Sequence, residues 1–349
     1  MTPALRTIRE KLFATPLDTV ITLVIAFLLW RAAVPLFEWF FADATFAGSS
    51  RADCTGAGAC WVFVRARFGQ FMYGLYPPSE RWRVDLAGII LVVSIALLCW
   101  KALPWRRAFA VAAFVVLPPL GIWLLAGGFG LRPVETREWG GLMLTIFISI
   151  YAGLIAIPLG ILLALGRQSR LPVIRTISVI FIEFWRGVPI VAVIFLASIL
   201  LPLIMPSGVG VDRLARAVIG LGLVIAAYMA EAVRGGLQAV PEGQHEAATA
   251  LGLGYWRATG FIVLPQAIRI ALPAMTNEFI SLVKSTTLVL IVSILDLLGI
   301  AQAALADPNW VGMNKEAYAF AGILYWLGCF GLSRVGLAME RSRSQGERY

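Results

Sequence analysis

Long apolar segments, separated by short stretches that carry arginine and lysine, run along most of the chain. The length of many of these segments is close to the about 20 residues that a helix needs in order to cross the hydrocarbon core of a bilayer. The pattern predicts about eight membrane-spanning helices, at roughly 17–41, 84–104, 107–127, 139–166, 174–201, 214–234, 276–297 and 317–337. The expected fold class is therefore an all-α polytopic membrane protein.

Composition supports this interpretation. The chain has 349 residues, of which 60% are hydrophobic and 14% are charged, whereas soluble domains run near 45–50% and about 25%. The net charge of +9 does not indicate nucleic acid, because the basic residues lie in short loops between apolar spans. That placement is a topology signal.

Lysine and arginine are concentrated in every second loop, on the same side of the membrane as the N-terminus. Loops rich in these residues usually lie in the cytoplasm. Both termini are therefore expected in the cytoplasm. The N-terminal segment runs into the first span without a small-residue cleavage site, so we expect this span to be retained.

The residue composition of the chain changes near residue 134. Residues 1–134 form a unit of three spans, and "GGFGLRPVETREWGG" is the expected junction with a core at 135–349. Glycines, prolines and intramembrane charges multiply in this core. No convincing internal repeat is visible, so an inverted-repeat secondary transporter finds no support in sequence symmetry.

The loop after the sixth span, "EAATALGLGYWRATGFIVLP" at 246–265, predicts a short helix. Pro241 can occupy its first position, and Glu242 and Glu246 then lie near the positive end of the helix dipole. The alanines have little bulk, and Gly252 with Gly254 can end the helix in a left-handed cap. From the residues alone, an ordinary connector and a docking helix are both open.

The spacing of Glu246, Ala247, Ala248, Gly252, Ile262, Leu264 and Pro265 resembles the EAA loop of ABC importer permeases. "FIEFWRGVPIV" and "AYMAEAVRGGLQAVPEGQHEAATALG" resemble the polar amino-acid uptake branch, of histidine and glutamine type. The three leading spans resemble those of the longer permease subunit of general L-amino-acid importers. One departure is Ser285, which stands where an acidic residue is expected.

The resemblance implies a type I ABC importer permease core of five helices with a cytoplasmic coupling loop at 236–265. Residues expected to couple this loop to an ATPase are Glu242, Glu246, Ala247, Ala248, Gly252, Leu264 and Pro265. It further implies two copies of a separate ATPase chain, which hold ATP and magnesium, and a periplasmic amino-acid-binding protein. The expected location is the bacterial cell inner membrane.

Five core spans are too few to enclose a whole pathway, so a second and different permease chain is expected. This chain lacks the phosphate-loop pattern G-x-x-x-x-G-K-[ST], and it is expected to bind no cofactor itself.

Charged and polar residues within the core spans are candidates for a substrate path. Ionisable groups in a bilayer usually mark a pathway or a buried pair, and a zwitterionic amino acid needs groups of both signs. Glu183 with Arg186, and Glu231 with Arg234, have i, i+3 spacing; Glu278 and Lys284 are expected to flank the seventh span. The candidates are Glu183, Arg186, Tyr228, Asn277, Glu278, Ser281, Lys284 and Thr286. The alternative is a structural pair in a helix broken at Gly187 and Pro189.

No catalytic nucleophile motif or metal-type cluster of His, Cys and carboxylates is visible, so neither catalysis nor a metal site is expected. The leading function is an amino-acid permease subunit of an ABC importer. The alternative is an ion- or proton-coupled secondary transporter that uses Glu183 and Glu231, and a membrane enzyme or scaffold is a third class. Cys54 and Cys60 either pair, if their loop faces an oxidising compartment, or remain free thiols.

Overall fold

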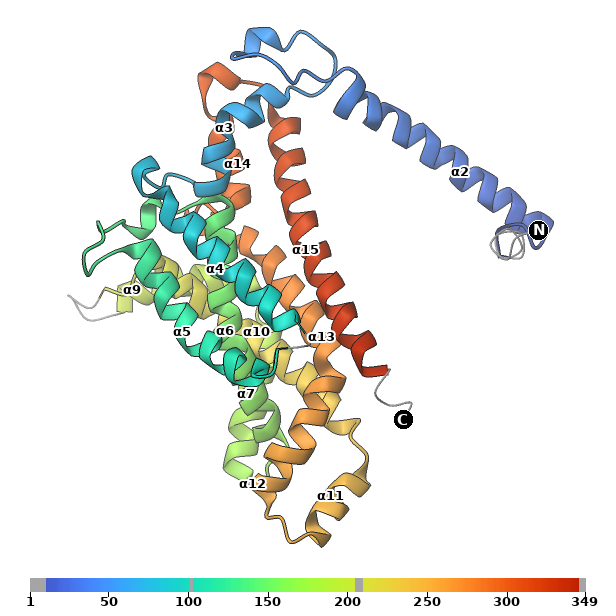
Figure 1. Cartoon of the computed structure of the whole chain (residues 1–349), viewed down its shortest axis with the longest axis vertical. Coiled ribbons are helices and arrows are strands. Elements are labelled where there is room, and N and C mark those ends of the chain that lie inside the picture. Colours follow the sequence, from blue (N-terminus) through green and yellow to red (C-terminus); the bar gives the residue numbers. More distant parts are fainter. Residues whose placement is uncertain (1–10, 101–102, 205–209, 345–349) are drawn as a thin grey trace. The chain divides into compact units, whose positions relative to one another are not determined.

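The computed structural model describes residues 11–100, 103–204 and 210–344, and every regular element in these ranges is helical (Figure 1). Seven of the described helices are long and apolar enough to cross a membrane, and the number rises to eight if one bent pair forms a single span. The predicted class, an all-α polytopic membrane protein of about eight spans, is confirmed.

The chain divides into two compact units, both of them discontinuous in sequence. Unit 1 comprises the described part of Met1–Phe68 together with Leu305–Ala319. Unit 2 comprises Gly69–Ala304 and the described part of Phe320–Tyr349. The boundary expected near residue 134 was inferred from a change in glycine, proline and charge content rather than from compactness, and it stays a prediction.

Unit 1 contains the first long apolar helix. Its elements are α2 (Pro16–Phe37), η1 (Glu38–Ala42), η2 (Arg51–Asp53), the first part of α3 (Trp61–Tyr73), η8 (Pro308–Trp310) and the start of α15 (Asn314–Ser344). α2 begins at a capping box, in which the Thr15 hydroxyl accepts from the Asp18 N–H and the Asp18 carboxylate accepts from the Thr15 N–H, both at 3.1 Å.

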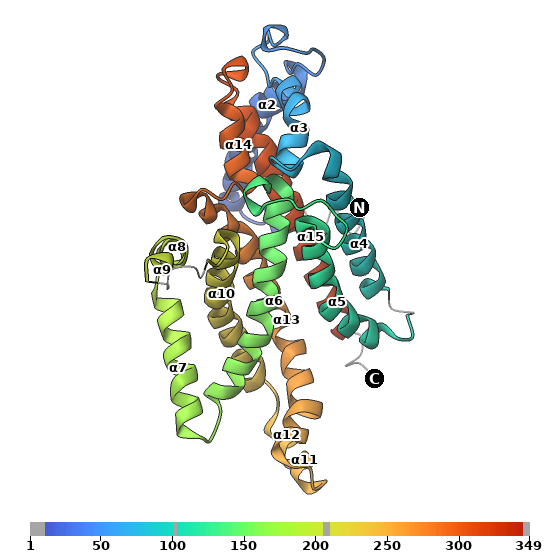
Figure 2. The ribbon, with the colours of Figure 1, turned by 90° about the vertical axis from the view of Figure 1, so that its left-hand side faces the viewer.

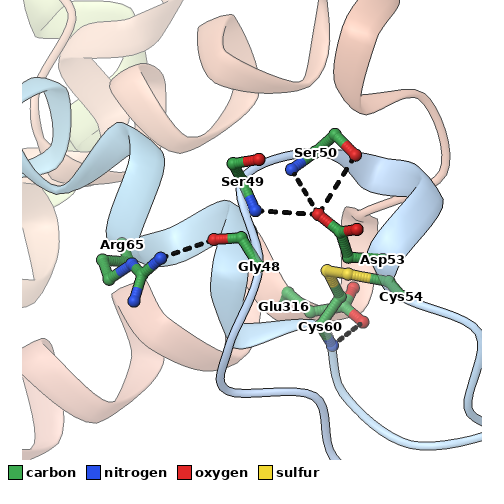
Figure 3. Close-up of a disulfide and its surroundings, with 8 residues drawn as sticks. All are labelled: Gly48, Ser49, Ser50, Asp53, Cys54, Cys60, Arg65 and Glu316. Atoms are coloured by element: carbon green, nitrogen blue, oxygen red, sulfur yellow. Dashed lines mark hydrogen bonds between the residues drawn. A yellow bond between two sulfur atoms is a disulfide. The ribbon is translucent and has the colours of Figure 1, made fainter.

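The loop between η1 and α3 is fixed by a disulfide and by hydrogen bonds (Figure 3). Cys54 and Cys60 are disulfide-bonded, and the Cys60 N–H donates to the buried carboxylate of Glu316 at 3.1 Å. The Asp53 carboxylate accepts from the N–H groups of Ser49 and Ser50, at 2.8 and 2.9 Å, and these bonds lower the pKa of Asp53.

Three helices form the centre of unit 2, namely α6 (Gly141–Arg167), α10 (Arg213–Gln238) and α13 (Leu264–Ser285). Glycines let them approach closely. A Cβ on Gly160 of α6 would lie 2.6 Å from the Cβ of Met229 on α10. A Cβ on Gly236 of α10 would lie 2.3 Å from the carbonyl oxygen of Ala267 on α13. Small residues at contacts between membrane helices allow such backbone approach.

Further helices surround this centre within unit 2. α4 (Arg81–Cys99) and α5 (Arg106–Ala126) run side by side, and α7 (Pro172–Gly187) packs against α6 and α10 (Figures 1 and 2). The remaining elements are η3 (Pro78–Glu80), η4 (Thr136–Glu138), α8 (Ile190–Phe195), η5 (Leu196–Leu200), α9 (Leu201–Ile204), α11 (Glu242–Ala250), α12 (Tyr255–Ala258), η6 (Thr259–Val263), η7 (Thr286–Val292), α14 (Leu297–Leu305) and the rest of α3 and α15.

The fifth predicted span is broken. α7 ends at Gly187, the helical segment Ile190–Ile204 follows, and the two directions differ by 101°. Pro189 is the N-cap of α8 with an extended ψ of 132°, so the chain leaves the helix immediately before it. The break that Gly187 and Pro189 predict is confirmed.

Helix begins well before the predicted seventh span. It continues from α12 through the π-helical turn η6 into α13, so the continuous apolar helical segment begins at Tyr255, whereas the predicted span begins near residue 276. The predicted coupling loop at 236–265 thus includes the start of this segment, and its bounds stay a prediction. Glu278 and Lys284, expected to flank the span, both lie inside α13.

Two prolines lie within this helical segment. Pro265 lies in the first turn of α13, directly after η6, where a missing N–H is tolerated. Pro273 lies inside α13, and a single internal proline is tolerated in membrane helices because neighbouring groups satisfy the freed carbonyl. Prolines that would end a helix in water thus remain within a helix here.

Candidate functional site

α11 ends in a Schellman motif. The Leu253 N–H donates to the Ala248 carbonyl at 3.0 Å, and the Gly252 N–H donates to the Thr249 carbonyl at 2.9 Å. Gly252 has a φ of +72°, a left-handed conformation that glycine adopts without Cβ strain. The glycine stop predicted after the alanines is confirmed at Gly252.

The start of α11 differs from the prediction by one residue. Pro241 is the N-cap with an extended ψ of 137°, not the first helical residue, because the chain still runs straight at this point. Glu242 therefore opens the helix, near the positive end of its dipole. The Gln266 side-chain amide donates to the Gln244 side-chain oxygen at 3.1 Å and links α11 to α13.

Most of α11 is exposed, and it lies with α12 at one end of unit 2 (Figures 1 and 2). Ala248 is buried and Leu264 is half-buried, so these two support the loop from inside. The other predicted coupling residues are exposed: Glu242, Glu246, Ala247, Gly252 and Pro265.

An exposed apolar patch, the loop patch, follows α11. It consists of Leu251, Tyr255, Trp256 and Phe261, whose side chains are 77%, 56%, 79% and 81% exposed. In a membrane protein such exposed apolar surface faces either lipid or a protein partner. Sequence reasoning did not single out these residues, although "LGLGYW" placed two large aromatics beside the helix stop.

Charged side chains from α6, α7 and α10 form an ion-pair network in unit 2. Arg167, the last residue of α6, contacts Glu183 at 3.0 Å and Glu231 at 2.6 Å through the same nitrogen, Nη1. Arg234 pairs with Glu231 at 2.7 Å. Arg186 lies 3.8 Å from Glu183 and 4.0 Å from Glu231. Glu231 thus faces three guanidinium groups.

The two ion pairs predicted from i, i+3 spacing differ in their N–O distance. Glu231 and Arg234 form the close pair that the spacing indicates, whereas Glu183 lies nearer to Arg167 than to Arg186. Sequence reasoning placed Arg167 in a loop and missed its role, because only the packing of α6 against α7 and α10 brings it to both carboxylates.

Arg186 connects this network to one more predicted pathway residue. Its guanidinium carbon lies 5.9 Å from the ring centroid of Tyr228 on α10, a cation–π distance. Glu278 on α13 is half-buried. The structure therefore brings together Glu183, Arg186 and Tyr228.

Three other predicted residues share a different surface. Asn277, Ser281 and Lys284 have i, i+4, i+7 spacing on α13, and all three are exposed. Polar groups on a membrane helix are unfavourable against lipid and usually face water or another protein.

Thr286 belongs neither to the ion-pair network around Arg186 nor to the exposed polar residues of α13. It is fully buried in a second polar cluster. There the buried Asp296 carboxylate accepts from the Tyr325 hydroxyl at 2.6 Å and from the Gly299 N–H at 3.0 Å. The Thr286 hydroxyl lies 3.5 Å from the same carboxylate. Asp296 lies at the end of the predicted span 276–297, and no role was predicted for it. An aspartate before an apolar run is nevertheless an N-cap signal, and the bond to Gly299 caps α14.

Residues 156–345 match the family model described as binding-protein-dependent transport system inner membrane component. The chain belongs to this family. Among the residues that the structure describes, no group of three or more His, Cys, Asp or Glu side chains could hold a metal ion.

Relatives within this family align with nearly the whole chain. The inner membrane amino-acid ABC transporter permease protein YhdY of Escherichia coli (strain K12) is 49% identical over 340 residues, or 97% of this chain and 93% of that protein. The glutamate/glutamine/aspartate/asparagine transport system permease protein BztC of Rhodobacter capsulatus is 34% identical over 415 aligned positions, or 99% and 95%.

One solved structure, a crystal structure of an amino acid ABC transporter with histidines, is also similar. It is 29% identical with a TM-score of 0.52, and the match covers 58% of this chain and 92% of that one. The predicted resemblance and the predicted function, a membrane permease subunit of an ABC transporter, are confirmed. None of these relatives is an ion-coupled transporter, so the alternative has no support among them.

Membership has three further consequences. Permease subunits are transport components rather than catalysts. The family description and the apolar helices place the chain in the inner membrane as a multi-pass protein. Binding-protein-dependent importers work, in general, with an ATPase and a substrate-binding protein.

Proposed function

We propose that this chain is the larger permease subunit of an importer that uses ATP to carry polar and general L-amino acids into the cell. The cargo class is supported by the relatives whose names specify amino acids, which align with 97% and 99% of this chain. The observation that carries the coupling part of the proposal is the exposed, glycine-capped α11 with its loop patch. These features fit a surface that a partner covers.

The proposed docking element is the exposed side of α11, formed by Glu242, Glu246 and Ala247, with Gly252 and the loop patch beside it. Two copies of an ATPase chain would dock here and on the second permease. ATP and magnesium would bind only to the ATPases, and this chain would bind no cofactor. Because α12, η6 and α13 form one continuous helical segment, a displacement of α12 by the docked ATPase would be transmitted along it towards the pathway residue Glu278.

The proposed substrate path lies beside Arg186, Glu183 and Tyr228, and it includes Glu278 on α13. A zwitterionic amino acid presents an ammonium and a carboxylate, and this group offers both signs of charge within a few ångströms. The exposed face of Asn277, Ser281 and Lys284 would complete the path against a second, different permease chain. Thr286, buried beside Asp296, would act on the path only through packing.

In the proposed orientation both termini are cytoplasmic, and α11 lies on the cytoplasmic side with the ATPases. The excess of lysine and arginine in the corresponding loops supports this assignment. A periplasmic amino-acid-binding protein would deliver cargo from the opposite side.

Reconstitution of the chain with its ATPase, its second permease and its binding protein in vesicles tests the proposal. Uptake of a panel of labelled amino acids should require ATP inside the vesicles and should favour amino acids with polar side chains. A vesicle that lacks the ATPase but has a proton gradient is the control. Uptake in that control, at the rate of the full complex, would refute ATP coupling.

A further inference from the structure

The side-chain amide of Gln266 joins the first turn of α11 to α13. Its nitrogen donates to the Gln244 side-chain oxygen at 3.1 Å and to the Ile262 carbonyl at 2.9 Å. A glutamine amide has two N–H groups, so both bonds form at once. Among the described residues, no other side-chain hydrogen bond or ion pair joins α11 to the helical segment 255–285.

The C-terminal end of α11 is held separately. The Ala248 carbonyl accepts from the Leu253 N–H in the Schellman motif, and the Ala248 side chain is fully buried where α11 packs against η6 and α12. Gln244 lies one turn before Ala248, about 6 Å along the helix axis. A single attachment would let α11 turn about it, whereas two separated attachments fix the direction of α11 relative to α13.

The backbone alone connects the first turn of α11 more directly to α10 than to α13. Only residues 239–241 separate α10 from α11, so a movement of Glu242 passes along the chain into α10. Gln244 and Gln266 are 22 positions apart in sequence. Their hydrogen bond is therefore the short route from the first turn of α11 to α13.

The turn that receives this bond is a weak point of the helical segment. η6 is π-helical, since the Leu264 N–H donates to the Thr259 carbonyl five residues earlier. Pro265 follows and has no N–H to donate to the preceding turn. Such turns mark places where a helix bends, and they are frequent at functional sites. The Gln266 amide holds this turn at Ile262 and holds α11 at Gln244.

We propose that Gln266 is a positioning residue for energy coupling. Its amide makes the first turn of α11 and the π turn η6 move together, so that the movement of a docked ATPase reaches Glu278 on α13 as well as α10. The inference rests on the proposed function, because it takes α11 as the surface on which the ATPase docks.

Gln244→Leu tests the bond from its exposed side. The substitution removes the acceptor for Gln266 without opening the protein interior, so the ATPase should still copurify. Uptake per ATP hydrolysed, measured in vesicles with the full complex, should fall roughly fivefold, the effect of one hydrogen bond on an equilibrium. Gln244→Glu keeps an acceptor oxygen and should keep the ratio. Thr249→Val is the matched control, because the Thr249 hydroxyl bonds only to the His245 carbonyl within α11.

Gln266→Leu tests the other partner. It should lower uptake per ATP at least as much as Gln244→Leu, because it also frees the Ile262 carbonyl. If both residues act through one bond, the double variant should lose no more than Gln266→Leu alone. Losses that multiply in the double variant would show independent effects and would overturn the positioning role.

The outcomes separate this inference from the proposed function. A fall in the thermal unfolding midpoint and in ATPase copurification, together with uptake, would indicate a structural effect and overturn the positioning role. Equal uptake per ATP in Gln244→Leu and Thr249→Val, with the ATPase bound to both, would overturn it as well and leave the proposed function standing. If the unmodified chain bound no ATPase, the proposed function would be wrong, and this inference with it.

Discussion

Glycine serves opposite purposes in the contact between α10 and α13 and at the end of α11. At Gly236 an added Cβ would lie 2.3 Å from the Ala267 carbonyl oxygen, so the position needs glycine for space. At Gly252 an added Cβ would meet nothing within 4 Å, but the φ of +72° disfavours other residues. The first glycine brings two helices together, whereas the second turns the chain.

This contrast separates two regions of the permease. Between α6, α10 and α13 the side chains are buried or ion-paired, so substitutions should change the free energy of unfolding. Around α11 they are exposed, so substitutions should change binding of the ATPase while the spans stay folded. Four experiments test this division, in order of decreasing effect on stability.

Glu231→Gln should give the largest loss of stability. It removes the carboxylate that Arg167, Arg186 and Arg234 share, and Glu231 is only 19% exposed. Breaking a fully buried ion pair costs about 3 kcal/mol or more; because the partner arginines are 27–37% exposed, we expect a loss of up to about 3 kcal/mol, visible as a lower thermal unfolding midpoint in detergent. Glu242→Gln, an exposed acid on α11, is the control and should leave the midpoint unchanged. Equal midpoints for the two variants would contradict the division.

Asp296→Ala should destabilise by about 2 kcal/mol, because it leaves the Tyr325 hydroxyl and the Gly299 N–H without their shared acceptor. Asp296→Asn keeps an oxygen for Gly299 and an amide for Tyr325, so it should lose less than half as much. Thermal unfolding of both variants measures the difference. If asparagine and alanine were equally destabilising, the negative charge rather than the bonding would hold the cluster.

Two neighbouring glycines of α10 form a matched pair. Gly236→Ala should destabilise by about 2 kcal/mol, because the methyl group overpacks the contact with Ala267. Gly235→Ala meets nothing within 4 Å and should be neutral or stabilising by up to about 1 kcal/mol through helix propensity. Chemical unfolding of both variants measures their free energies of unfolding. An equal loss of stability at Gly235 and Gly236 would show that overpacking is not the cause.

Gly252→Val should affect stability least, by about 1 kcal/mol, since valine is strained in the left-handed conformation. It should nevertheless weaken ATPase binding strongly, because the Schellman motif sets the end of α11. Asparagine tolerates this conformation, so Gly252→Asn adds bulk without the strain. Copurification of the ATPase should fail with valine and largely persist with asparagine. Failure of both variants would point to bulk at the docking surface rather than to the cap.

The sequence was informative wherever the signal was local. Span lengths, the break at Gly187 and Pro189, and the stop at Gly252 all follow from residues within one or two turns of each other. The helical segment that contains the predicted seventh span begins earlier than the apolar run suggests, because Pro265 and Pro273 do not end a helix whose neighbours satisfy the freed carbonyls.

Contacts between distant segments could not be predicted in the same way. Arg167 gives no sign in sequence that one nitrogen will meet both Glu183 and Glu231, since that depends on how α6, α7 and α10 pack. Asp296 likewise meets Tyr325 only after α15 is in place. Of the predicted pathway residues, those on α7 and α10 came together, while Thr286 joined a cluster that periodicity does not reveal.

The bond from Cys60 to Glu316 has a consequence for biogenesis. The two residues are 256 positions apart, and unit 1 contains both the disulfide loop and Leu305–Ala319. The ribosome therefore inserts nearly the entire membrane domain before the loop can receive its last partner. Unit 1 can be completed only after residues 305–319 have been translated, so a product truncated before them would expose an unfinished loop that a quality-control protease could recognise.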